Sequence, residues 1–203
     1  MNAKEFAKRS NSIFDKAFAE GKEPNDRVLW HDRDRQYFRF HEICRYIDMR
    51  RDSVLDVGCG NGELLGFLSF CGFCGKYTGV DIHSKLVGEA RGRFSKADFR
   101  VLDIFDSAVE TYDCVVMSGV FNANVGQDLD FVVRFITRMH ELSRFRTVFN
   151  AVSTHVNFCQ PEIFYIDPSE LLERLLKITP QVEMRHGFLP FNFTVCMHAH
   201  AQG

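Results

Sequence analysis

The sequence lacks a surplus of basic residues. Its 203 residues include 25 Lys and Arg against 27 Asp and Glu, which gives a formal net charge of -2. Proteins that bind nucleic acids usually carry a basic surplus. We therefore expect no DNA or RNA partner.

Long apolar runs are also missing. No run approaches the roughly 20 residues that a membrane helix needs, so we expect no membrane association. The first six residues, MNAKEF, lack the apolar core of a signal peptide. Together these absences predict a cytoplasmic protein.

Paired cysteine motifs are scarce. The seven cysteines are scattered and lie mostly beside apolar residues, which predicts reduced, buried thiols. Cys71 and Cys74 have CxxC spacing, but a zinc site needs two more ligands and the sequence has no second pair. We therefore expect no metal site.

Apolar residues are present in ordinary amount. They make up 45% of the chain, and Phe alone occurs 21 times against a single Trp. This composition and length predict one globular domain with a real core. Dense packing is the simplest role for the many phenylalanines, and an apolar substrate pocket is a second one.

The N-terminal quarter is helical in pattern. Apolar residues recur at helical spacing from Lys4 to Glu20 and from about Asp34 to Met49, and the stretch 21–25 breaks the pattern between them. We expect residues 1–50 to form a helical lid on a core domain of residues 51–203.

From Ser53 onward, strands alternate with helices. Ser84 and Asp167 are the expected caps of two of the helices. This alternation predicts a mostly parallel seven-stranded sheet with helices on both faces, closed by a C-terminal antiparallel hairpin. The expected strands cover 54–57, 77–81, 99–102, 112–117, 146–152, 181–185 and 192–198, and the expected helices cover 63–70, 84–94, 129–142 and 168–177.

A glycine loop follows the first expected strand. Gly58, Gly60 and Gly62 occupy every second position, and Asp56 precedes them. Dinucleotide-binding loops have G-x-G-x-x-G spacing instead, with a pyrophosphate at the helix N-terminus. The Asp56 carboxylate would repel a pyrophosphate, whereas it suits a ligand with an ammonium group and no phosphate.

This segment, VLDVGCGNG at 54–62, resembles the first motif of class I S-adenosylmethionine-dependent methyltransferases. The resemblance covers most of the chain from Ser53 onward and is to a small, single-domain bacterial subgroup. It implies a Rossmann-like fold, S-adenosyl-L-methionine as cofactor and S-adenosyl-L-homocysteine as product.

The resemblance also implies a set of cofactor-binding residues. Asp81 ends the second strand about 20 residues past the loop, where an acid binds the ribose hydroxyls. Asp103 and Ile104 correspond to the adenine site, and Ser118 and Gly119 to the segment beneath the methionine portion. The full expected set is Arg39, Asp56, Gly58, Cys59, Gly60, Gly62, Asp81, Ile82, Asp103, Ile104, Ser118 and Gly119.

Arg39 comes from a second region of resemblance. Trp30, Gln36, Arg39 and Phe40 have the spacing of the entry helix of that subgroup. A guanidinium matches a carboxylate in two-point contact, so Arg39 is expected to pair with the cofactor carboxylate. The alternative is a surface arginine on an amphipathic helix.

Three residues are candidates for catalysis. His155 follows the fifth expected strand and is the first choice as a general base, with His31 as another histidine near the site and Tyr37 as a substrate-orienting group. A histidine chosen by position alone is more often structural or solvated.

The segment after the fourth expected strand, MSGVFN at 117–122, narrows the acceptor class. It has neither the Asn- or Asp-Pro-Pro-aromatic sequence of amino-directed nucleic-acid methyltransferases nor the Pro-Cys pair of cytosine enzymes. The sequence therefore predicts methyl transfer to an O or N atom of a small molecule. The alternatives are a non-catalytic cofactor-binding protein and a protein methyltransferase.

Overall fold

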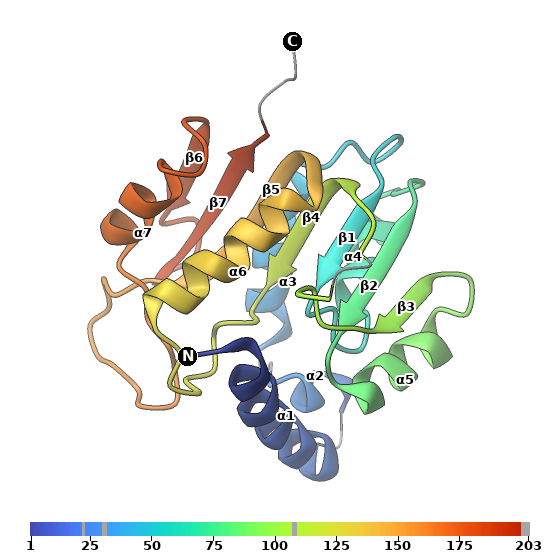
Figure 1. Ribbon diagram of the computed structural model, residues 1–203. Coiled ribbons are helices and arrows are strands. Elements are labelled where there is room, and N and C mark those ends of the chain that lie inside the picture. Colours follow the sequence, from blue (N-terminus) through green and yellow to red (C-terminus); the bar gives the residue numbers. More distant parts are fainter. Residues whose placement is uncertain (22, 30–31, 107–108, 200–203) are drawn as a thin grey trace.

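The computed structural model describes residues 1–21, 23–29, 32–106 and 109–199. Its strands form one seven-stranded sheet in the order β3-β2-β1-β4-β5-β7-β6 (Figure 1). Strands β1 to β5 are parallel, and β7 runs antiparallel to both β5 and β6. The predicted fold class is confirmed. The strands are β1 (Val54–Val57), β2 (Tyr77–Asp81), β3 (Asp98–Val101), β4 (Tyr112–Ser118), β5 (Ser143–Val152), β6 (Val182–His186) and β7 (Asn192–His198).

Helices cover both faces of the sheet and enclose two apolar cores. Because side chains alternate along a buried strand, Val115 and Met117 of β4 enter one core while Cys114 and Val116 enter the other. Helices α6 and α7 pack on the first face, and α3, α4 and α5 on the second. The helices are α1 (Ala3–Glu20), α2 (Pro24–Arg27), α3 (Arg33–Cys44), α4 (Glu63–Phe70), α5 (Ser84–Arg93), α6 (Leu129–Glu141) and α7 (Pro168–Leu175).

The order of the strands creates a crevice. Strand β1 pairs with β2 on one side and with β4 on the other, so the connections that leave β1 and β4 diverge. In open parallel sheets, ligands bind outside the carboxyl ends of the strands at such a switch point. Helices α1 and α2 lie across this end of the sheet (Figure 1).

Two boundaries in the N-terminal region differ from the prediction. Helix α2 begins within the stretch predicted as a break, because Pro24 occupies the first turn, where no backbone N–H is needed, and Glu23 and Asp26 form a capping box. The next helix, α3, ends at Cys44 rather than Met49.

Two boundaries in the core also differ. The cap of α5 is His83 rather than Ser84, because the His83 Nδ1 atom accepts a hydrogen bond of 3.3 Å from the Leu86 backbone N–H. Strand β5 begins at Ser143, three residues before the expected start at Arg146.

The cysteines are less buried than predicted. All seven are free thiols, but only Cys59, Cys114 and Cys196 are buried, and Cys71, Cys74 and Cys159 are exposed. In the ranges that the structure describes, no helix has the length and apolar character needed to cross a bilayer.

Candidate functional site

A cavity of about 120 Å³ lies at the switch point between β1 and β4. The loops that follow β1, β2, β3 and β4 form its floor, and side chains of α1, α3 and α6 form its walls. Ten of the twelve expected cofactor-binding residues line it, all except Arg39 and Gly62. The topology has therefore brought together expected residues that are up to 63 positions apart, from Asp56 to Gly119.

The glycine loop needs glycine for both conformation and space. Gly58, Gly60 and Gly62 have φ values of 73°, 54° and 82°, in the left-handed region that side chains rarely adopt. A Cβ atom on Gly58 would lie 2.2 Å from Cγ2 of Val120, and one on Gly60 would lie 3.0 Å from Val28. The loop thus exposes bare backbone to the cavity at the N-terminus of α4.

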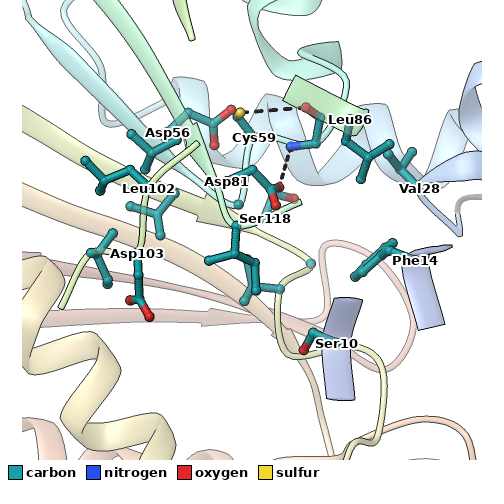
Figure 2. A pocket seen from close by; sticks show the side chains of 18 of the residues that line it. Ser10, Phe14, Val28, Asp56, Cys59, Asp81, Leu86, Leu102, Asp103 and Ser118 are labelled. Carbon is teal, nitrogen blue, oxygen red and sulfur yellow. Dashed lines mark hydrogen bonds between the residues drawn. The ribbon is translucent and has the colours of Figure 1, made fainter. Parts of the chain in front are cut away.

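Asp81 fastens this loop to the end of β2. One carboxylate oxygen accepts a 2.9 Å hydrogen bond from the Gly60 N–H (Figure 2), and the other accepts a 2.9 Å bond from the His83 N–H. Burial raises the pKa of Asp81, and the backbone donors of His83 and Gly60 act in the opposite direction. The half-buried carboxylate lies in the cavity wall with lone pairs left for a further donor.

Asp56 lies deeper, at the end of β1. It is 2% exposed, and its Oδ2 atom accepts a 2.5 Å hydrogen bond from the Tyr77 hydroxyl. Burial raises the pKa of Asp56 to about 7; the Tyr77 hydrogen bond lowers it and the nearby Asp81 raises it further. Near neutral pH this carboxyl group therefore exists in both protonation states.

The raised pKa of Asp56 predicts an unusual pH dependence of folding stability. The unfolded state loses this proton near the ordinary value of 3.8 and the folded state near 7, so the folded state binds more protons in between and stability falls as pH rises. We expect the free energy of unfolding to drop by about 2 kcal/mol between pH 5 and pH 8 from this group alone. Chemical denaturation of Asp56→Asn should lack that drop. An equal drop in the variant and the parent would contradict this assignment.

Aromatic side chains form the wall nearest β3. Phe6 of α1 and Phe131 and Phe135 of α6 contact one another with ring centroids 4.8–6.3 Å apart. Phe105, which follows Ile104, packs edge-on against Phe135 at 5.7 Å. This wall adjoins Ile82, Asp103 and Ile104, so the β3 side of the cavity is apolar and suits a flat ring.

Arg39 does not reach the cavity. It is 3% exposed, and its guanidinium donates to the side-chain oxygens of Asn122 and Asn192. Burial lowers the pKa of Arg39 to about 9. The structure thus places Arg39 in a buried polar group behind the site, on the side of β4 and β7. Arg39 therefore neither lines the cavity nor lies on the surface, which were the two positions expected from the sequence.

Two of the three catalytic candidates, Tyr37 and His155, are not part of the cavity lining. The Tyr37 hydroxyl donates to Glu63, which does line the cavity, at 2.8 Å and accepts from Arg33. His155 is exposed, its backbone N–H donates to Ser153, and its ring lies 6.0 Å from that of His186. His31 lies outside the described residues.

Several lining residues were not expected from the sequence. Ser10 and Phe14 of α1 reach the cavity (Figure 2), as do Gln36 of α3 and the pair Phe131 and Phe135 of α6. Helical periodicity identifies these side chains as inward-facing. It does not separate a helix face that lines a cavity from one that packs on a core.

Comparisons with known proteins agree with this geometry. Residues 54–143 match a family model described as a methyltransferase domain. Rv1506c of Mycobacterium tuberculosis, whose name gives it as a methyltransferase by inference, is 28% identical over 154 residues, which cover 70% of this chain and 90% of that protein.

Solved structures share the fold. The magnesium protoporphyrin IX methyltransferase ChlM of Synechocystis PCC 6803 with bound SAH has a TM-score of 0.70 at 14% identity, with 97% of each chain covered. DhpI in its SAM-HEP complex has a TM-score of 0.71 at 18% identity, with 97% of this chain and 99% of that chain covered.

Proposed function

We propose that this chain, whose residues 54–143 match a methyltransferase-domain model, is a class I, S-adenosylmethionine-dependent methyltransferase that methylates an oxygen or nitrogen atom of a small molecule. The observation that carries the cofactor assignment is the charge of the cavity. Asp56, Glu63, Asp81 and Asp103 line it, while no Lys, Arg or His does so among the described residues. Such a wall suits a positively charged nucleoside without phosphate and disfavours a dinucleotide.

The residues present fit this cofactor. Asp81 offers lone pairs to two adjacent hydroxyl donors, the apolar wall by Ile82 and Ile104 accepts a flat base, and the glycine loop admits a chain against its backbone. We infer that the ribose binds at Asp81, the base between Ile82 and Ile104 with Asp103 nearby, and the remainder along Gly58, Cys59 and Gly60 towards Ser118 and Gly119.

The cofactor, when bound, supplies a methyl carbon that is activated by the positively charged sulfur to which it is attached. The protein contributes position and exclusion of water, which reduce the barrier without a covalent intermediate. Fixed backbone dipoles of the loop and the walls of α1 and α3 provide both.

We also propose that α1, within the segment of residues 1–50, acts as a lid, whereas α3 of the same segment packs on the sheet. The cavity of about 120 Å³ is smaller than the roughly 300–1,000 Å³ of ordinary ligand sites, and α1 closes one side of it. The C-terminal half of α1 is held by an exposed ion pair between Asp15 and Lys85 at 2.6 Å, and Asp15 also lies 3.5 Å from the ring of the buried His83. Exposed pairs contribute little stability, so this half of α1 is the part that opens most readily.

For acceptors that lose a proton, His155 is the proposed base, reached by an acceptor that extends from the cavity to the loop after β5. Replacement of His155 by Gln should lower kcat by about 100-fold for such an acceptor, because general-base catalysis contributes this much or more. The affinity for S-adenosylhomocysteine should stay unchanged. Steady-state kinetics over a pH series measures the effect, and an unchanged kcat and pH profile would remove His155 from the mechanism.

The function itself is tested by turnover. The purified chain is incubated with methyl-labelled S-adenosylmethionine and a panel of small phenols, carboxylic acids, alcohols and amines, with a protein extract as a separate arm. Label transfer to a small molecule, lost in Asp81→Ala, is the expected result. Transfer only to proteins would favour the protein-methyltransferase alternative, and cofactor binding without any transfer would favour a non-catalytic binding protein.

A further inference from the structure

Gln36 is a polar side chain that faces the cavity without a partner. It is 3% exposed, and its Oε1 atom is buried with no hydrogen bond. No hydrogen bond joins its carboxamide to any other residue in the described part of the chain. Buried amides are nearly always hydrogen-bonded, so this one is suited to a ligand that completes it.

The position of Gln36 in the cavity indicates which end of the ligand it contacts. Helix α3 packs against α4, β4, β5 and β7, so Gln36 enters the cavity from the β4 side of β1. Asp81 and Asp103 follow β2 and β3 and enter from the opposite side. A cofactor whose nucleoside lies at β2 and β3 therefore has its amino-acid end beside Gln36.

The chemistry of Gln36 matches an amino acid. A carboxamide has an oxygen that accepts from an ammonium group and an NH2 group that donates to a carboxylate. Two other neutral donors in the wall are engaged, since Asn61 donates to the Pro24 carbonyl at 2.9 Å and Ser118 donates to Asn150 at 3.1 Å. A third, Ser10, belongs to α1 rather than α3. Arg39, the residue expected for the carboxylate, is directed to Asn122 and Asn192 instead.

We propose that the Gln36 carboxamide binds the amino-acid end of the cofactor, with its oxygen on the ammonium group and its NH2 group on the carboxylate. This assignment rests on the proposed cofactor site. It makes Gln36 a cofactor-positioning residue, since a fixed amino-acid end sets the direction in which the methyl group points.

The test compares two ligands by calorimetry. S-adenosylhomocysteine has the amino acid, whereas 5′-methylthioadenosine has the same nucleoside and thioether without it. In Gln36→Leu, we expect S-adenosylhomocysteine to bind roughly 10- to 100-fold more weakly, as for loss of hydrogen bonds to charged groups. Binding of 5′-methylthioadenosine should change less than about 2-fold, because the truncated ligand does not reach position 36. Asp81→Asn is the matched control and should weaken both ligands.

The outcomes separate three cases. Equal weakening of both ligands by Gln36→Leu, or no weakening of either, would overturn the proposal. A parent protein that binds neither ligand would instead overturn the cofactor site on which the proposal rests. Thermal unfolding without ligand checks for a structural role, because loss of an unpaired buried amide should leave the Tm of Gln36→Leu unchanged or higher. Gln36→Ala serves if the Leu variant does not fold, and it should weaken S-adenosylhomocysteine selectively because it removes both carboxamide hydrogen bonds.

Discussion

Replacement of Asp81 by Ala is expected to weaken S-adenosylhomocysteine binding by about 100-fold or more. The loss of two hydrogen bonds to one carboxylate accounts for a change of this size. The same side chain also holds the Gly60 and His83 N–H groups, so the variant loosens the glycine loop that the ligand must meet. Isothermal titration calorimetry measures the change.

A neighbouring acid provides the control. Asp98 begins β3 and pairs with Arg100 at 2.6 Å, outside the cavity lining. Asp98→Ala should leave the affinity unchanged and cost no more than about 1 kcal/mol of stability, as expected of a partly exposed pair. Equal affinities of the Asp81 and Asp98 variants would show that the ligand does not use the end of β2.

Replacement of Gly58 by Ala is the second large expected effect. The left-handed φ of 73° costs an alanine about 1–2 kcal/mol, and the new Cβ would lie 2.2 Å from Val120. Relief of that overlap costs about 1–3 kcal/mol more and displaces the loop from the cavity. We expect the free energy of unfolding to fall by about 2–5 kcal/mol and S-adenosylhomocysteine affinity to fall by at least about 100-fold.

Gly72 is the control position, because an alanine there has the backbone strain of a positive φ without steric crowding. Its φ is 87°, but a Cβ atom there would have nothing within 4 Å. Gly72→Ala should therefore cost only about 1–2 kcal/mol and leave ligand binding unchanged. The Gly58→Ala substitution should cost less free energy of unfolding in a Val120→Ala background than in the parent protein. If Gly58→Ala is no worse than Gly72→Ala, the close approach of Val120 to the loop is not important.

The sequence predicted the sheet and the floor of the cavity because these depend on local patterns. Buried strands such as Val54–Val57 are mostly apolar, and acids such as Asp81 stand at or near the ends of those strands. Parallel strands of one sheet bring such ends together without further information. That rule predicts that Asp56, Asp81 and Asp103 lie around one site, and all three line the cavity.

The walls could not be predicted in the same way. Gln36 and Arg39 lie three residues apart on α3, almost one turn, yet Gln36 faces the cavity and Arg39 faces Asn122 and Asn192. Which of them meets the ligand depends on how α3 is rotated against β4 and β5, and packing of the whole molecule sets that rotation. The sequence predicted Arg39 for the site, whereas Gln36 of the same helix is the side chain that lines the cavity.

Local chemistry explains the smaller errors. Pro24 was interpreted as a helix breaker, although proline is favoured in the first turn of a helix, where it stands in α2. His83 is an unusual cap whose ring nitrogen replaces the side-chain oxygen of Ser, Thr, Asp or Asn. The preference for Ser84 therefore followed the common rule and missed the residue beside it.

The central claim is that the acid-lined cavity at the switch point binds S-adenosylmethionine. Calorimetric titration of the purified chain with S-adenosylmethionine, S-adenosylhomocysteine and NAD tests it in one experiment. We expect micromolar binding, with a Kd near 1 μM corresponding to about -8 kcal/mol, for both sulfur compounds and none for NAD. Binding of NAD with no binding of either sulfur compound would contradict it.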